Sequence, residues 1–283
     1  MTMKRVLYAL AFGCVFSGVA AYSVGAQTPA ARVTLTRLDC GATKSPRDLA
    51  AFSDTHAYDG VKKALVASCY LVRHGDRYLL WDTGYPAASR TAPDSPIALP
   101  RTVVEQLRRL NVDPARVAHV GVSHYHGDHT GQARDFPHAT LLIGAGDWAA
   151  LTGPRMTGMG APDPAPLAHW ISGGGTVEQV RGDKDVFGDG SVVMLDTPGH
   201  TPGHHSLLVR LKGRGAFLLT GDLSHFQQNY DTNGVPSFNT DRADTLASLD
   251  RFKKMAANLK ATVVIQHEPA DVAKLPAFPQ AAE

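Results

Sequence analysis

Cysteine is scarce in this sequence, with three residues in a chain of 283. Cys14 lies in an N-terminal apolar run and is a poor match to a lipoprotein cleavage site, so we do not expect lipidation. Cys40 and Cys69 remain, and two thiols can form at most one disulfide. An oxidising compartment would permit that bond, but the sequence alone leaves it open.

An excess of charge of one sign is also missing. The chain has 28 Lys and Arg against 26 Asp and Glu, and it is formally neutral without Lys4 and Arg5. Proteins that bind polyanions usually show a basic excess or a basic stripe. We therefore expect no nucleic-acid partner.

Long apolar runs are missing after the first residues. Lys4 and Arg5 precede an uncharged run at 6–21, and small residues follow as far as Ala26. This pattern is typical of a secretory signal cleaved after Ala26, and the run is too short for a convincing membrane span. We expect a signal peptide at 1–26, a single domain at 27–283 and a secreted or periplasmic protein; an uncleaved anchor is the alternative.

Histidine is concentrated in one short segment. His124, His126, Asp128 and His129 lie within six residues, directly after an apolar run. Residues two apart on an extended segment point the same way, so the first two imidazoles can bind one cation together. Gly127 permits a turn for which a residue with a Cβ would be costly, and this turn carries the other two side chains to a second position. Neutral imidazole suits zinc, so we predict a metal site, with a surface polar cluster as the alternative.

Three later β-segments end in residues of the same kind, namely His200, Asp222 and His267. Ligands on rigid strand ends can be held to the tolerance that a metal requires. Apolar periodicity predicts strands at 32–39, 67–73, 77–81, 117–122, 139–143, 176–180, 191–195, 205–211, 216–220 and 262–266. It predicts helices at 101–110, 145–151 and 242–260. Residues 152–175, rich in Gly and Pro, predict a lid over the metal site or a surface excursion.

Taken in order, these motifs resemble the metallo-β-lactamase-fold hydrolases. The matching pieces span nearly all of the mature sequence: Asp82-Thr83-Gly84, His124 to His129, Pro198-Gly199-His200, Gly221-Asp222 and His267. The resemblance implies an α/β (α+β) fold, a four-layer αββα sandwich with the metals at one edge. It assigns His124, His126 and His200 to one metal, assigns Asp128, His129 and His267 to the other, and makes Asp222 the bridge.

The bridging Asp222 narrows the resemblance, because true β-lactamases of this fold lack it while lactonase, glyoxalase II and phosphodiesterase branches have it. The segments 68–71 and 81–86 resemble the N-acyl homoserine lactonases. That branch implies two divalent ions, Zn2+ in our expectation, and opening of the lactone ring by a metal-bridging hydroxide. Asp128 would pass a proton to the leaving oxygen. The sequence departs at His225, where those lactonases commonly carry a Tyr that contacts the substrate carbonyl, so substrate scope can differ.

The resemblance implies a small-molecule lactone or ester as substrate and a possible homodimer. The expected substrate contacts are Phe52, Tyr85, Met156, Met159, Trp170 and His225. His225 could also merely pack at the rim, and His204 could lie behind the ligands or be incidental. The alternatives are hydrolysis of phosphotriesters, aryl esters, thioesters or β-lactams by the same metals, or a non-catalytic periplasmic metal-binding protein.

Overall fold

The polar strand ends of this protein lie on two β-sheets. The computed structural model describes residues 31–283, so the expected signal peptide at 1–26 lies outside the described residues. The larger sheet has seven strands in the order β6-β1-β4-β5-β7-β8-β9. Its members are β1 (Val33–Thr43), β4 (Val66–His74), β5 (Arg77–Trp81), β6 (Ile97–Ala98), β7 (Val117–Gly121), β8 (Thr140–Gly144) and β9 (Val177–Val180).

The smaller sheet has five strands in sequence order. They are β10 (Lys184–Asp185), β11 (Val192–Asp196), β12 (His205–Leu211), β13 (Gly215–Leu219) and β14 (Thr262–Val264). A separate pair consists of β2 (Arg47–Asp48) and β3 (Lys62–Lys63).

The helices are α1 (Val103–Arg109), α2 (Gly127–Thr130), α3 (Ala145–Thr152), α4 (Ala168–Ile171), α5 (Gln227–Thr232) and α6 (Arg242–Leu259). Of these, α1, α3 and α4 cover the outer face of the larger sheet, and α6 covers that of the smaller one. Short 3-10 turns are η1 (Ala50–Phe52), η2 (Ala87–Arg90), η3 (Pro114–Arg116), η4 (Ala133–Asp135), η5 (Ala165–Leu167), η6 (Gly221–Leu223) and η7 (Pro269–Lys274).

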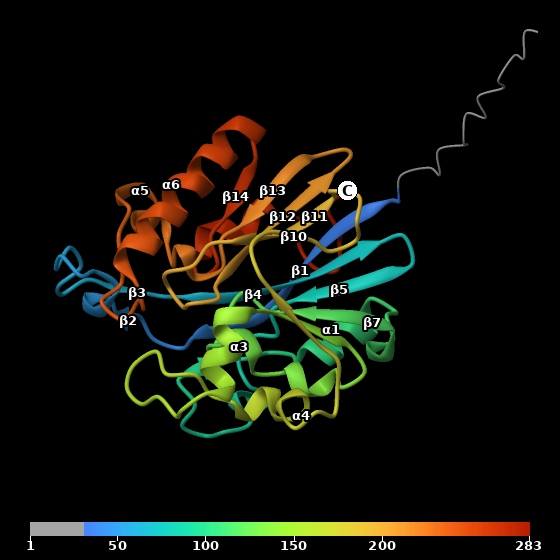
Figure 1. The fold of residues 1–283 in the computed structure, drawn as a ribbon, viewed down its shortest axis with the longest axis horizontal. Helices are drawn as coiled ribbons and strands as arrows, with labels where there is room; N and C mark the ends of the chain where they lie inside the picture. The colour runs from blue at the N-terminus through green and yellow to red at the C-terminus, as the bar shows by residue number, and fades with distance from the viewer. Residues whose placement is uncertain (1–30) are drawn as a thin grey trace, which may run out of the picture. The chain divides into compact units, whose positions relative to one another are not determined.

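Three apolar layers hold these elements together. Leu79 and Trp81 of the larger sheet pack with Leu207 and Phe217 of the smaller one, and these side chains are buried. A second layer joins the larger sheet to α1, α3 and α4, and a third joins the smaller sheet to α6. Figure 1 shows the resulting order, with α6 on one side, the two sheets in the middle and α1, α3 and α4 on the other side. The four-layer α/β sandwich predicted from the sequence is confirmed.

Helix α6 shows how local sequence produces one of these layers. The Asp241 side chain accepts a hydrogen bond from the Asp244 N–H, which satisfies a free donor at the N-terminus. Leu249, Phe252 and Ala256 recur at helical spacing and are buried against the smaller sheet. Burying a side chain such as Leu249 or Phe252 contributes roughly 1.5–3 kcal/mol. The helix ends at Lys260, whose φ is +49°.

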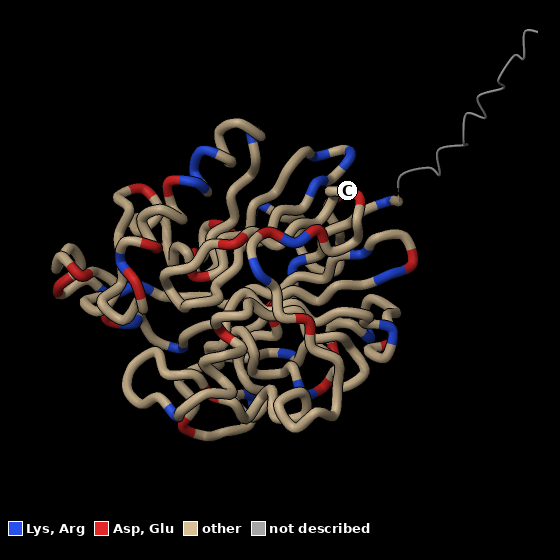
Figure 2. The backbone as a smooth tube through the Cα atoms, viewed as in Figure 1, with Lys and Arg blue, Asp and Glu red and all other residues tan. Residues whose placement is uncertain are grey.

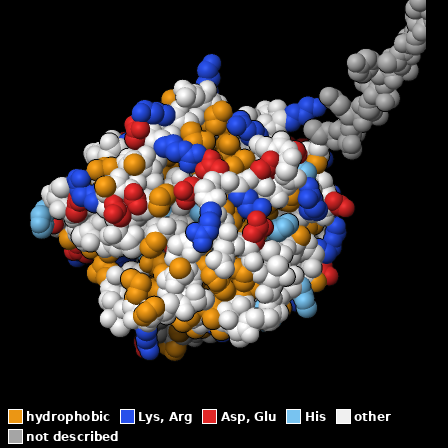
Figure 3. All heavy atoms as spheres, viewed as in Figure 1, with side chains coloured by type: hydrophobic (Ala, Val, Ile, Leu, Met, Phe, Trp, Pro, Cys, Tyr) orange, Lys and Arg blue, Asp and Glu red, His pale blue; other side chains and the backbone are white. Residues whose placement is uncertain are grey.

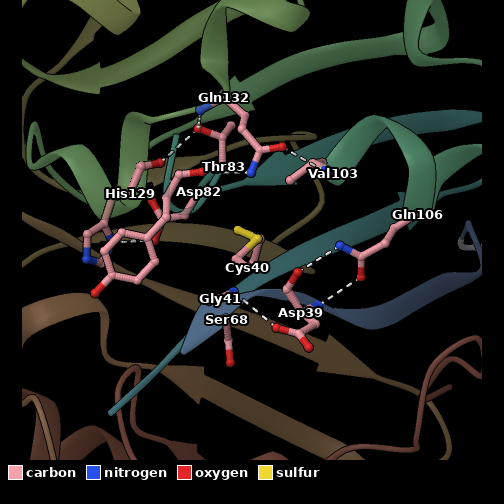
Figure 4. Close-up of a disulfide and its surroundings, with 12 residues drawn as sticks. Asp39, Cys40, Gly41, Ser68, Asp82, Thr83, Val103, Gln106, His129 and Gln132 are labelled. Carbon is pink, nitrogen blue, oxygen red and sulfur yellow. Dashed lines mark hydrogen bonds and ion pairs between the residues drawn. A yellow bond between two sulfur atoms is a disulfide. The ribbon is translucent and has the colours of Figure 1, made fainter. Parts of the chain in front are cut away.

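A disulfide joins neighbouring strands of the larger sheet. Cys40 of β1 and Cys69 of β4 are bonded, with their Cα atoms 5.8 Å apart, so the bond that the sequence left open is present. Figure 4 shows this bond beside the turn that follows β5. Gly84 of that turn has a φ of +69°, and an added Cβ would lie 2.4 Å from the Cβ of Cys40. Glycine therefore allows the turn to pack directly against the disulfide.

Charges are interspersed over the described residues. Lys and Arg alternate with Asp and Glu along the backbone trace in Figure 2, and both signs mix with apolar side chains on the face in Figure 3. Within residues 31–283, no helix combines the length and the apolar character needed to cross a membrane.

Candidate metal centre

The histidine motif begins where β7 ends. His124 and His126 lie in the bend that follows β7, where His126 is extended with ψ of 152°, and His129 lies in α2. Strands β5, β7 and β8 are parallel, so their carboxyl ends meet at one edge of the larger sheet. Gly127 has no positive φ, and an added Cβ would meet no atom within 4 Å. The expectation that this turn requires glycine is therefore wrong.

The first ligand group brings His200 to the motif. His124 Nε2 lies 2.8 Å from His126 Nδ1, and His200 Nε2 lies 3.2 Å and 3.1 Å from these two atoms. Three imidazole nitrogens around one tetrahedral zinc would be roughly 3.3 Å apart, given Zn–N bonds of about 2.0–2.1 Å. The three side chains thus converge at nearly the spacing that one ion requires.

The second ligand group consists of Asp128, His129 and His267. Asp222 lies between the two groups and turns one oxygen to each. Its Oδ1 is 3.2 Å from His129 Nε2 and 2.9 Å from His267 Nε2, and its Oδ2 is 3.5 Å from His200 Nε2. The structure therefore brings together all seven residues that the sequence singled out as ligands, with Asp222 in the bridging place.

Every imidazole of the two groups is oriented by a hydrogen bond on the nitrogen that faces away. The acceptors are Ser123 Oγ for His124 (3.0 Å), Gly160 O for His126 (3.1 Å), Asp82 Oδ2 for His129 (2.9 Å), Asn239 Oδ1 for His200 (2.8 Å) and Val66 O for His267 (2.7 Å). In the neutral form of each imidazole, an acceptor on the outward nitrogen holds the proton there and leaves the inward nitrogen bare. This arrangement is typical of metal-binding histidines.

The polar atoms at the centre fit divalent cations. His129 Nε2 and Asp222 Oδ1 are buried without a hydrogen-bond partner within the described residues. Burial and neighbouring imidazoles lower the pKa of His124 and His200 well below the ordinary value, which keeps them neutral. Burial raises the pKa of Asp222, but His267, His225 and His129 together lower it well below the ordinary value. Neutral imidazoles around a carboxylate are the donor set that zinc accepts.

Asp82 supports the motif from the turn after β5. Its buried carboxylate accepts hydrogen bonds from the Ser123 N–H (2.7 Å), from Ser123 Oγ (3.0 Å) and from His129 Nδ1 (2.9 Å). Figure 4 shows the side chain pointing toward His129. Asp82 has a φ of +56°, a conformation that Asp and Asn tolerate better than most residues. The sequence identified this motif but not its contact with His129.

Asp147, at the start of α3, joins the motif to the loop that carries His200. Its buried carboxylate accepts hydrogen bonds from the Tyr125 N–H (3.1 Å), from Thr201 Oγ1 (2.9 Å) and from the Gly203 N–H (2.7 Å). Burial raises the pKa of Asp147 to about 7, although these hydrogen bonds act in the opposite direction. Nothing in the sequence around residue 147 indicated this contact.

A cavity of about 490 Å3 opens above the two ligand groups. Asp128 and Asp222 lie in its floor, and Phe52, Tyr85 and Met159 are part of its wall. Burial and the carboxylates of Asp128 and Asp222 raise the pKa of Tyr85, so its phenol stays protonated. The cavity thus presents apolar surface beside a protonated hydroxyl and the cluster.

Two expected substrate contacts lie elsewhere. Trp170 is 2% exposed, packs in the layer beneath the larger sheet and donates its indole N–H to the Ala139 carbonyl. Met156 is 47% exposed and does not line the cavity. Both share the segment 152–175 with Met159, but only Met159 and Gly160 of that segment reach the cavity. Assigning Trp170 and Met156 to the site is therefore corrected.

His225 reaches the centre from the turn after β13. Its Nε2 lies 3.0 Å from Asp222 Oδ2, and its ring lies 4.9 Å from that of Phe52 and 5.7 Å from that of Phe238. Its Nδ1 is buried and has no hydrogen-bond partner within residues 31–283. The imidazole therefore lies against the bridging carboxylate as well as against the apolar wall.

Several cavity residues escaped the sequence reasoning. Arg47, Leu65 and Phe238 line the cavity, although they come from segments without a recognisable motif. The polar, mixed composition of residues 41–63 does not indicate that this segment forms part of the cavity wall, and Phe52 is the single residue of it that is expected there from the sequence. Three-dimensional packing, not a local pattern, places these side chains.

The fold and the ligand arrangement define a metal-dependent hydrolase with paired ligand groups at one edge of a β-sandwich. Residues 63–267 match the family described as the Metallo-beta-lactamase superfamily. The N-acyl homoserine lactonase AttM of Rhizobium radiobacter is 34% identical over 194 residues, which cover 62% of this chain and 68% of that relative.

Solved structures give the same result for the fold. A quorum-quenching N-acyl homoserine lactone lactonase superposes with a TM-score of 0.75 and 23% identity, covering 89% of this chain and 99% of that one. An N-acyl homoserine lactone hydrolase with the product N-hexanoyl-L-homoserine at its catalytic metal centre superposes with a TM-score of 0.74 and 22% identity. This match covers 89% of this chain and 100% of that one. The chain belongs to the metallo-beta-lactamase superfamily, which confirms the resemblance drawn from its motifs.

Proposed function

We propose that this protein opens the lactone ring of N-acyl homoserine lactones at a centre of two zinc ions. The observation that carries the proposal is the set of five oriented imidazoles, whose bare nitrogens converge on Asp222 at the floor of a cavity of about 490 Å3. One ion would be held by His124, His126 and His200, and the other by Asp128, His129 and His267. Asp222 would contact both ions. When bound, such a pair supplies an activated water and polarises a carbonyl.

Asp128 is the residue placed to move a proton. Its side chain is 24% exposed and lines the cavity, while Oδ2 lies 3.8 Å from His267 Nε2. A carboxylate at the floor of the cavity can accept a proton from water and deliver it to the leaving alkoxide oxygen. The oxygen of that water bonds to the carbonyl carbon, the ring C–O bond breaks, and the product carries one new carboxyl group and one new hydroxyl.

His225 and the cavity wall would hold the substrate. Nε2 of His225 lies 3.0 Å from Asp222 Oδ2, and an N–H there could be shared between that carboxylate and a substrate carbonyl, in the role that the resemblance gives to a Tyr. Phe52, Leu65, Met159 and Phe238 offer apolar surface for an acyl chain. The names of the relative and of the product complex described above support this substrate class.

The decisive experiment measures initial rates with purified, zinc-loaded protein. We expect turnover of an N-acyl homoserine lactone to a product heavier by one water, and at most slow turnover of a phosphotriester and a cephalosporin. His129→Ala should abolish this activity, while His138→Ala, a change at an exposed histidine outside both ligand groups, should leave it intact. If the zinc-loaded protein opens the lactone no faster than protein treated with a chelator, the proposal is refuted. If it cleaves another ester faster than the lactone, that ester replaces the lactone as the proposed substrate.

We also propose that the protein is exported. Lys4, Arg5 and the uncharged run that follows support a signal cleaved after Ala26, and the bond between Cys40 and Cys69 suits an oxidising compartment. Mass spectrometry of protein recovered from a periplasmic or culture fraction should give an N-terminus at residue 27. Recovery of only uncleaved protein from the cytoplasm would contradict export.

A further inference from the structure

His204 is a further imidazole beside the cluster, in addition to the five of the ligand groups and His225, and its inward nitrogen faces a peptide group. Its Nδ1–H donates to the Thr197 carbonyl (3.0 Å), which leaves Nε2 bare. Nε2 accepts a hydrogen bond from the N–H of Asp222 at 2.9 Å. The ring is fully buried, with its centroid 5.4 Å from that of His124 and 5.9 Å from that of His200.

We propose that His204 is a positioning residue of the metal centre, which fixes the main chain of Asp222 so that its two oxygens reach both ligand groups. His204 belongs to neither ligand group. Its contribution therefore passes through the peptide of Asp222 and not through an ion. The inference depends on the proposed metal centre but not on the identity of the substrate.

The backbone before Asp222 is shaped to receive this imidazole. Gly221 has a φ of +55°, and an added Cβ would lie 2.7 Å from His204 Nε2 and 3.0 Å from the Cβ of Ser123. Asp222 itself departs from helical geometry inside η6, with φ of −96° and ψ of 19°. Its N–H therefore depends on the side-chain acceptor, because a buried donor left without a partner is unfavourable.

The same imidazole begins a buried network that reaches the other strand ends. Thr197 Oγ1 lies 3.0 Å from His204 Nδ1 and 3.1 Å from Ser206 Oγ, and Ser206 Oγ donates to the Thr220 carbonyl (2.8 Å). Thr220 Oγ1 accepts the N–H of Gln266 (3.2 Å), the residue before His267. Thus the strand ends that precede His200, Asp222 and His267 are joined, and His204 connects this network to Asp222.

Two substitutions separate the acceptor from the volume of the ring. In His204→Gln, Oε1 can occupy the place of Nε2 and still accept the Asp222 N–H. In His204→Leu, the side chain fills similar space without an acceptor. His205→Gln is the matched control, because His205 is also buried but its ring nitrogens face the carbonyls of Gly203 (2.8 Å) and Gly182 (3.2 Å) and not the Asp222 N–H.

The readout is zinc affinity, measured by competition with a chelator, together with the number of ions bound. Loss of an orienting partner of a metal ligand typically weakens binding by roughly 10–100-fold. We expect a loss of that size in His204→Leu, with a much smaller loss in His204→Gln and none in His205→Gln. Equal losses in both His204 variants, or a loss in His205→Gln as large as in His204→Leu, would overturn the inference.

A second measurement needs no variant. In 15N-labelled wild-type protein, an N–H···N hydrogen bond should give a scalar coupling between the Asp222 amide nitrogen and His204 Nε2. The 15N shifts should also place the imidazole proton on Nδ1. A protonated Nε2 or an absent coupling would refute the positioning role. Lack of lactone turnover alone would refute only the proposed function, and lack of any zinc binding would refute both.

Discussion

Replacing Asp82 by Asn should weaken the binding of one ion without unfolding the protein. The carboxylate of Asp82 accepts the N–H of Ser123 on Oδ1 and the Nδ1–H of His129 on Oδ2. In Asp82→Asn, the amide oxygen would keep the contact with the Ser123 N–H, which turns the new NH2 group toward His129. Two donors cannot face each other, so the proton of His129 should move from Nδ1 to Nε2. Nε2 is the nitrogen that faces Asp222, and a protonated nitrogen cannot bind a metal.

The magnitude follows from the contacts that change. Loss of an orienting carboxylate should weaken zinc binding at the His129 side by roughly 10–100-fold, or about 1.4–2.7 kcal/mol. The backbone should be unaffected, because Asn also tolerates the φ of +56° at this position. The free energy of unfolding of metal-free protein should fall by about 1.5–3 kcal/mol, the value of a hydrogen bond to a charged group.

The assay combines elemental analysis, chelator competition and urea unfolding of the metal-free protein. Asp135→Asn is the control, since Asp135 is exposed and belongs to neither ligand group. We expect two bound ions in the control and weakened binding of one ion in Asp82→Asn. Two ions bound to Asp82→Asn with wild-type affinity would refute the tautomer argument. Failure of this variant to fold would refute the claim that its backbone is tolerated.

Four further outcomes follow from the structure. Chelation should lower the melting temperature, because ions that bind only the folded state stabilise it, and zinc should restore it; equal melting with and without metal would contradict the site. Replacing Cys40 and Cys69 together by Ala should lower the free energy of unfolding by about 3–4 kcal/mol for a loop of 29 residues, and an unchanged urea midpoint would contradict this. The pKa of Asp147 is raised from 3.8 to about 7, so its protonated form favours the folded state. In metal-free protein, the free energy of unfolding of the wild type minus that of Asp147→Asn should therefore fall as pH rises from about 4 to about 7. A difference that does not change with pH would contradict this prediction. His225→Tyr should retain lactone turnover, while His225→Phe should lower kcat by roughly 10–100-fold with less effect on KM; equal rates would exclude a donor role.

The part of the site that could be predicted from sequence lies on strand ends. His124, His200, Asp222 and His267 each follow an apolar β-segment, so the chain itself indicates which side chains share an edge of the sandwich. The helix predicted at 242–260 is α6 within one residue, because its apolar spacing is regular over several turns. Regular apolar spacing and short motifs involve residues that are close together in the chain, so both can be recognised in the sequence alone.

The remainder depends on contacts between distant segments. The acceptor for His200 is Asn239, and the carboxylate beneath the motif is Asp147 of α3; neither stands in a pattern that suggests a partner. The Gly- and Pro-rich surroundings of Trp170 predict a loop at the site, yet packing buries this side chain beneath the larger sheet. Composition of a segment does not determine which of its apolar residues face the core.

Two of the five imidazole acceptors are main-chain carbonyls, those of Val66 and Gly160. Every amino acid carries this oxygen, so replacing the side chain at either position does not delete the acceptor itself. Ser123, Asp82 and Asn239 offer only a side-chain oxygen to their histidines, and an apolar replacement deletes it. In a saturation library, position 66 should therefore accept varied residues that keep the strand, whereas 82, 123 and 239 should show narrow preferences. Position 160 should also be narrow, but because its φ of +79° favours glycine and not because a side-chain acceptor is lost.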